Sequence, residues 1–139
     1  MAWLGAFVLT QLVEAPLYAW SLRRWSRSPR WERVAVAFLP SALTHPLLWL
    51  GFPALREHLS YVAAVGVAEG LVVLIEAALI ARFLDPARPV ERRPFEPRPH
   101  DEAESTRSRR LGLALGVATV ANTLSVAVGL ACRALFDWP

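Results

Sequence analysis

Four ionisable side chains interrupt long apolar stretches of this sequence: Glu14, His45, Glu69 and Glu76. A charged group at the centre of a bilayer costs on the order of 2.5–3.5 kcal/mol, so turning all four towards lipid would cost about 10 kcal/mol. That sum is comparable to the stability of a whole domain. We therefore expect the four side chains to face one another, or a small wet cavity, between helices.

These side chains fall at similar depths in their apolar stretches, and Asn122 adds an amide near the middle of the last one. Each stretch thus brings at least one strongly polar group to the same central layer. We interpret Glu14, His45, Glu69, Glu76 and Asn122 as the candidate catalytic residues of one shared site. Glu76 has an alternative partner in Arg82, nearer the end of its stretch.

Other polar residues extend this layer along each predicted helix. Residues three or four apart share a helix face, and such spacings link Thr10, Glu14 and Tyr18, then Ser41, Thr44 and His45, then Thr119, Asn122 and Ser125. Pairs of glycines at the same spacing, Gly66 with Gly70 and Gly112 with Gly116, predict close approach between helices.

Prolines lie beside two of the polar residues. Pro16 follows Glu14 by two positions, and Pro46 directly follows His45. Proline removes a backbone donor and disfavours helical geometry in the residue before it. We expect the helix to kink or open at Thr44-His45-Pro46, and irregular backbone at membrane depth is tolerated only where it is buried or lines a cavity.

An intramembrane hydrolase is the first functional hypothesis for these residues. A glutamate shielded from bulk water can act as a general base on a water molecule, and His45 with Asn122 could stabilise a developing oxyanion. This set of glutamate, histidine and asparagine is similar to that of the CAAX-prenyl-type intramembrane proteases. Those proteins carry a Glu-Glu pair followed by arginine, which this sequence lacks.

Two other classes of function use the same residues differently. Carboxylates and histidine in series at mid-depth are what a proton or cation relay requires, and four short helices predict that a conducting path needs an oligomer. Alternatively, the protein is a non-catalytic subunit of a larger membrane complex. The cofactor is left open, since the sequence implies none strongly.

A metal site is disfavoured by spacing. His45 and Glu69 would be the first choices as ligands, but two ligands on one helix usually lie three or four residues apart. Glu69 and Glu76 are separated by seven residues, about 10 Å of helix rise. The single cysteine, Cys132, excludes a cysteine-based zinc site and an intramolecular disulfide.

Four stretches of about twenty residues or slightly more position these side chains, at about 2–22, 34–55, 61–84 and 111–136. Such lengths suit helices that cross a hydrocarbon core of about 30 Å. The predicted fold is therefore all-α: a polytopic membrane protein whose residues 1–139 form a single four-helix domain.

Arginines predict the orientation of these spans. They concentrate in the loops 23–33 and 85–110, whereas the opposite side carries only Arg56 and Arg133. By the positive-inside rule both loops are cytoplasmic and both termini lie outside. All 15 basic residues are arginine, which is typical of GC-rich bacterial genes and indicates a bacterial inner membrane.

The segment 85–110 combines prolines with arginines and glutamates. This composition predicts an extended tether, followed by a helix that Asp101 and Glu104 begin and that runs into the fourth span. Its arginines could attract anionic lipid. The bilayer, another copy of the chain and a second membrane protein are the expected partners, and no nucleic-acid-binding motif is present.

Overall fold

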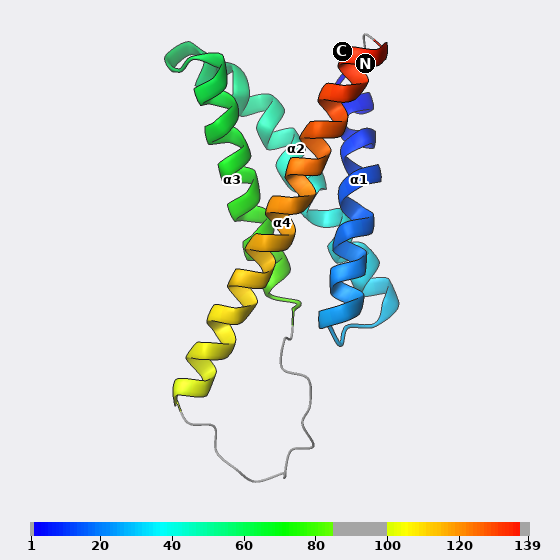
Figure 1. The fold of residues 1–139 in the computed structure, drawn as a ribbon, viewed down its shortest axis with the longest axis vertical. Coiled ribbons are helices and arrows are strands. Elements are labelled where there is room, and N and C mark those ends of the chain that lie inside the picture. Colours follow the sequence, from blue (N-terminus) through cyan, green and yellow to red (C-terminus); the bar gives the residue numbers. More distant parts are fainter. Residues whose placement is uncertain (1, 85–99, 137–139) are drawn as a thin grey trace.

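A computed structural model describes residues 2–84 and 100–136 of the 139-residue chain. These residues form four helices: α1 (Ala2–Trp25), α2 (Arg30–His58), α3 (Tyr61–Ala81) and α4 (His100–Phe136). Each helix contacts the next in the chain, and α4 closes the bundle against α1 (Figure 1). The prediction of an all-helical protein is confirmed.

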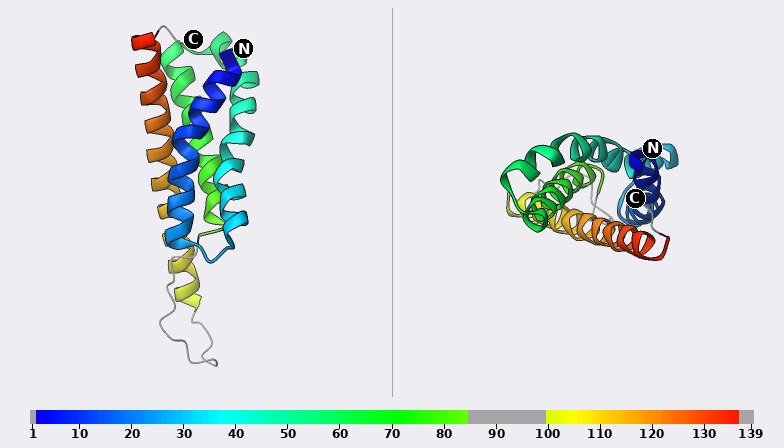
Figure 2. Two further views of the ribbon diagram at one scale, coloured as in Figure 1. Left: turned by 90° about the vertical axis from the view of Figure 1, so that its right-hand side faces the viewer. Right: turned by 90° about the horizontal axis from the view of Figure 1, so that it is seen from above.

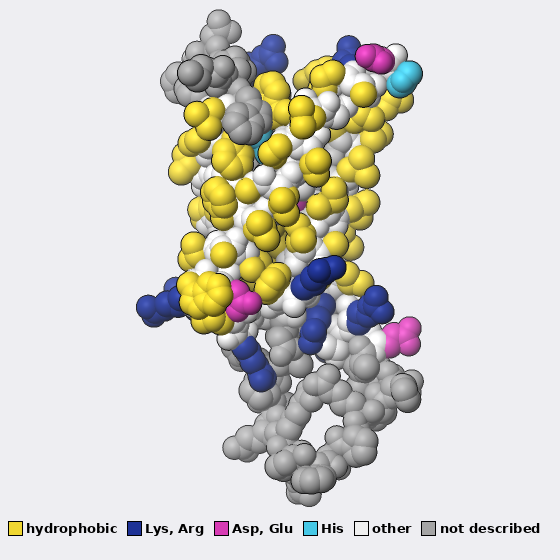
Figure 3. Space-filling model, turned by 180° about the vertical axis from the view of Figure 1, so that it is seen from behind, with side chains coloured by type: hydrophobic (Ala, Val, Ile, Leu, Met, Phe, Trp, Pro, Cys, Tyr) yellow, Lys and Arg dark blue, Asp and Glu magenta, His cyan; other side chains and the backbone are white. Residues whose placement is uncertain are grey.

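Three of the described helices are long and apolar enough to cross a membrane: α2, α3 and the Glu104–Leu135 part of α4. On the face seen in Figure 3, apolar side chains cover the middle of the surface, and arginines lie at its two edges. These features support the prediction of a membrane protein. Helix α1 has 24 residues and is not among the three. Its crossing of the membrane stays a prediction.

The predicted arginine-rich loops are shorter than expected where the structure describes them. Helix α1 continues to Trp25 and α2 begins at Arg30, so the connection spans only 26–29 and the remaining part of the loop 23–33 is helical. Within 85–110, helix α4 already begins at His100 and continues unbroken into the apolar stretch, as the sequence suggested. Residues 85–99, predicted to form the tether, and the side chain of Asp101 lie outside the described residues.

The two ends of the bundle differ in charge. Both termini lie at one end, which we call the terminal end (Figures 1 and 2). The other, arginine-rich end carries nine described arginines: Arg23, Arg24, Arg27, Arg30, Arg33, Arg82, Arg107, Arg109 and Arg110. Helices α2 and α4 incline in opposite directions between these ends (Figure 1).

Alanines, rather than glycines, allow the helices to approach one another. Ala77, Ala114, Ala118 and Ala121 are almost or completely buried in the main hydrophobic core, which lies towards the arginine-rich end. The four predicted contact glycines are exposed, and a Cβ atom added to any of them would meet no neighbour within 4 Å. The prediction that these glycines mediate close packing within the bundle is therefore wrong: they lie on the outer faces of α3 and α4.

Candidate functional site

The carboxylate of Glu76 lies at the centre of the bundle and joins all four helices. It is completely buried. Its Oε2 atom accepts hydrogen bonds from the hydroxyl of Tyr18 on α1 and from Nδ2 of Asn122 on α4, the latter at 2.7 Å. Its Oε1 atom accepts one from the hydroxyl of Thr44 on α2, at 2.8 Å. One α3 side chain therefore anchors a donor from each of the other three helices.

Asn122 reaches Glu76 from a well-fixed position. Its Nδ2 group also donates to the backbone carbonyl of Ala118, one turn earlier in α4, at 3.0 Å. A longer contact of 3.4 Å connects it to the hydroxyl of Tyr18. The amide is thus held by backbone and side-chain acceptors together, which fixes the direction of the bond to Glu76.

Glu14 is the second deeply buried carboxylate, with 2% of its side chain exposed. Its Oε2 atom accepts a hydrogen bond from the hydroxyl of Ser41 on α2 at 2.5 Å. One turn before it, the side chain of Gln11 donates to the backbone carbonyl of Phe38 at 3.4 Å. The donors that contact Glu14 and Glu76 are hydroxyls and an amide; the described arginines lie nearer the helix ends.

All five predicted site residues line one cavity of about 50 Å³: Glu14, His45, Glu69, Glu76 and Asn122. Thr10, Thr44 and Ser125 contribute hydroxyl groups to the same wall. The sequence argument that polar side chains at one depth should meet is therefore consistent with the geometry. A polar cavity of this size has room for water, since a single molecule needs roughly 10–15 Å³.

His45 lines the cavity from α2. The side chain is buried, and its ring packs against that of Phe7 on α1, with the centroids 5.4 Å apart. Helix α2 continues through Thr44-His45-Pro46 and ends only at His58. The helix therefore does not open at this triplet, and a kink there stays a prediction. The hydroxyl of Thr44, which also donates to the carbonyl of Pro40 at 3.1 Å, adds a side-chain bond to this turn.

Two further expectations differ from the structure. Glu76 does not pair with Arg82: its oxygens face Tyr18, Thr44 and Asn122, whereas Arg82 is exposed just beyond the end of α3. Thr119 does not belong to the polar face of α4, because it is exposed while Asn122 is buried. A three-residue step rotates a helix by 300°, so such a series drifts off a face within two steps.

Residues that sequence reasoning treated only as neighbours prove to be direct partners of the carboxylates. Tyr18, Ser41 and Thr44 are all buried and donate to Glu76 or Glu14. The four-residue spacing from Glu14 to Tyr18 was the available signal, but spacing alone does not reveal that Tyr18 reaches Glu76 rather than its neighbour in α1. Within the described residues, no cluster of three or more His, Cys, Asp or Glu side chains is arranged to hold a metal ion.

Comparison with known proteins adds no family to this geometry. No protein-family model, no curated protein and no solved structure matches the chain.

Proposed function

We propose that the chain crosses a bacterial inner membrane four times, with both termini outside and the arginine-rich end in the cytoplasm. The two termini lie at the same end, as an even number of crossings requires (Figure 1). The nine arginines at the other end, against Arg56 and Arg133 at the terminal end, agree with the positive-inside rule. Helix α1, with 24 residues, is about 36 Å long and matches the bilayer core.

We propose that the central site binds and exchanges protons, as part of a relay or transport system. The observation that carries this proposal is the burial of two carboxylates, Glu14 and Glu76, on one cavity that also holds His45, with hydroxyls and an amide as their described hydrogen-bond donors. An anion removed from water costs several kcal/mol unless an opposite charge neutralises it. Because the described arginines lie nearer the helix ends, a bound proton is the simplest neutralising charge.

The direction of proton entry follows from the packing on either side of the cavity. Towards the arginine-rich end, buried Leu22, Ile80 and Leu84 fill the bundle together with alanines. Towards the terminal end, half-buried Glu69 lines the cavity beside His45. We infer that protons enter from the terminal side through Glu69 and His45, and that onward transfer requires a rearrangement or a partner.

Infrared difference spectroscopy of the protein in lipid tests this proposal. A change of pH on the wild type should produce a carbonyl band from buried carboxyl groups that lose or gain a proton. Glu14→Gln and Glu76→Gln should each remove part of that band, whereas Glu57→Gln, at an exposed position in α2, should leave it intact. A band unaffected by both buried substitutions would overturn the proposal, and a band that depends on Na⁺ would replace the proton by a cation.

An intramembrane hydrolase is the second candidate, favoured because Glu14, His45 and Asn122 line the same cavity. Glu76 would be a poor general base, since three donors already occupy its oxygens. The base would therefore be Glu14 or Glu69. Hydrolysis of fluorogenic acyl esters by the purified protein, lost in Glu14→Gln or in Glu69→Gln, would favour this candidate over a relay. If another chain always co-purifies with the protein, and neither proton exchange nor ester hydrolysis is detected, the protein is a structural subunit.

A further inference from the structure

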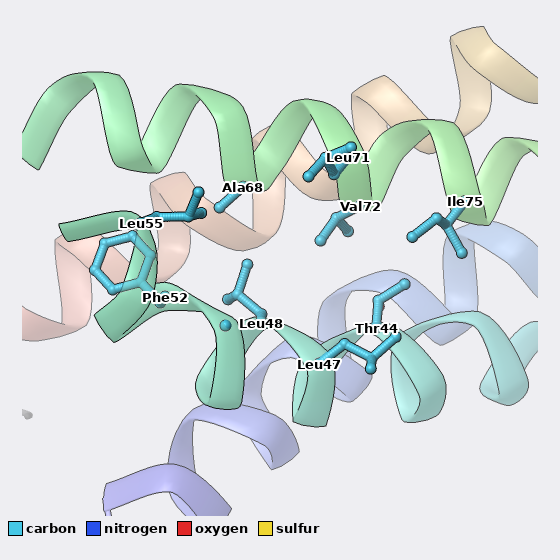
Figure 4. Close-up of a pocket in the computed structure, with 10 residues that line it drawn as sticks. Thr44, Leu47, Leu48, Phe52, Leu55, Ala68, Leu71, Val72 and Ile75 are labelled. Carbon is cyan, nitrogen blue, oxygen red and sulfur yellow. The ribbon is translucent and has the colours of Figure 1, made fainter. Parts of the chain in front are cut away.

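An apolar groove lies between α2 and α3, on the side of the central site that faces the terminal end. Its volume is about 270 Å³. The side chains of Leu48 and Leu55 on α2 and of Val72 and Ile75 on α3 project towards it (Figure 4). Gly51 leaves additional room on the α2 wall, where an added Cβ atom would meet nothing within 4 Å.

The groove adjoins the polar cavity directly. Thr44, Leu48 and Val72 line both spaces. Thr44 is the one side chain with a polar group among those that line the groove, and its hydroxyl donates to Glu76. An occupant of the groove would therefore end against a residue that holds the central carboxylate.

The chemistry of the groove selects a hydrocarbon occupant. Water does not fill a space with almost entirely apolar walls. The part of this chain that the structure leaves undescribed between α3 and α4, residues 85–99, is rich in arginine, glutamate and proline and begins from the opposite end of α3. The groove lies within the apolar band of the protein surface, so the acyl chains of the bilayer are the hydrocarbon that surrounds it.

A cation marks the outer end of the groove. Leu55, the last groove residue on α2, is followed directly by Arg56 at the turn into α3. The Arg56 guanidinium donates to the carbonyl of Leu59 at 3.1 Å and lies 5.4 Å from the ring centroid of Tyr61. Arg56 is exposed and has further N–H donors that can bind a phosphate.

We propose that this groove binds one anionic phospholipid from the leaflet at the terminal end. One acyl chain lies along α2 and α3 with its methyl end at Thr44 and Ile75, and the phosphate binds Arg56. The bound chain separates the polar cavity from the surrounding hydrocarbon. The proposal rests on the membrane location of α2 and α3 and not on proton exchange at Glu76.

A second groove provides a matched control. It lies between α1 and α4 near the arginine-rich end, has a volume of about 360 Å³ and is lined by residues that include Leu17, Trp20 and Gly116. It shares no lining residue with the polar cavity. Gly116 also has open space where a Cβ would stand, so Gly116→Leu and Gly51→Leu make the same change in two different grooves.

Native mass spectrometry of the protein, extracted from vesicles of phosphatidylglycerol and phosphatidylcholine, tests the proposal. The wild type should retain one phosphatidylglycerol. Gly51→Leu should reduce this retention at least fivefold, while Gly116→Leu leaves it unchanged. Arg56→Gln should remove the preference for phosphatidylglycerol over phosphatidylcholine. A phosphatidylglycerol with a diazirine at the chain terminus should label residues around Thr44 and Ile75.

Three results would overturn the proposal: equal retention by the wild type and Gly51→Leu, equal losses in the two glycine variants, or labelling spread evenly over all four helices. Circular dichroism and thermal unfolding of each variant separate lost binding from lost folding. Should Gly51→Leu fail to fold, Ala68→Leu narrows the same groove from α3 and gives the same test. Lipid retention is measured without a change of pH. A failure of this proposal can therefore be distinguished from a failure of the proton-exchange proposal.

Discussion

The two halves of the bundle on either side of the polar layer are built differently. Towards the arginine-rich end, alanines alternate with Leu22, Ile80 and Leu84 in a continuous core that excludes solvent. Towards the terminal end, the buried apolar residues among those described are only Ala64 and Ala68 on α3. Large side chains of α2 in this half, such as Leu47 and Leu50, point outwards instead.

The difference shows how one bundle can hold a costly polar layer and still leave it accessible. The half towards the arginine-rich end, the closed half, fixes the helices at short distances, so the donors to Glu76 stay in position. The half towards the terminal end, the open half, leaves a groove and a small cavity on the other side of the same residues. A site between two tightly packed halves would be inert, and a site between two open halves would lose its geometry.

Replacing the two α3 glutamates should give the largest contrast between the halves. Glu76→Ala leaves the donors from Tyr18, Thr44 and Asn122 without an acceptor and creates a void, so it should destabilise the bundle by about 4 kcal/mol. Glu69→Ala, at a half-buried position in the open half, should cost less than about 1 kcal/mol. Equilibrium unfolding in mixed detergent micelles measures both. An equal decrease in unfolding free energy for the two variants would mean that the halves do not differ in rigidity.

Enlarging one alanine in each half should give a smaller contrast. Ala118 is fully buried in the closed half, so Ala118→Leu should cost about 2–3 kcal/mol by overpacking. Ala68 lines the α2–α3 groove, and the added side chain of Ala68→Leu can enter that space at a cost below about 1 kcal/mol. The same unfolding measurement compares the two variants. A cost at Ala68 as large as that at Ala118 would show that the groove closes in the membrane.

Sequence reasoning could predict the polar layer because the cost of burying charge in lipid leaves few arrangements open. Glu14, His45, Glu69, Glu76 and Asn122 line one cavity, as equal depth suggested. It could not predict the donors to each carboxylate, because the relative tilts of α1, α2 and α3 decide whether Tyr18 and Thr44 reach Glu76 (Figure 1). Nor could it distinguish alanine from glycine contacts, since both are small and occur at helical spacing.

Adding a methyl group to the outward glycines should give the smallest effect. Gly70 and Gly116 have open space where a Cβ atom would stand, so neither half of the bundle is disturbed by Gly70→Ala or Gly116→Ala. Alanine is the better helix former, by about 1 kcal/mol in helix interiors. We expect each variant to be about 0.5 kcal/mol more stable than the wild type.

The larger change Gly70→Leu tests whether the outer face of α3 packs against a second copy of the chain. For an isolated bundle the leucine would face lipid and leave both unfolding and particle size unchanged. A glycine face packed against a second copy would instead be disrupted, and the particle mass measured by light scattering would fall. Gly116→Leu on α4 is the matched control, because it tests whether any such assembly uses the face of α3 specifically. If neither Gly70→Leu nor Gly116→Leu changes stability, close packing between helices involves only the alanines of the closed half.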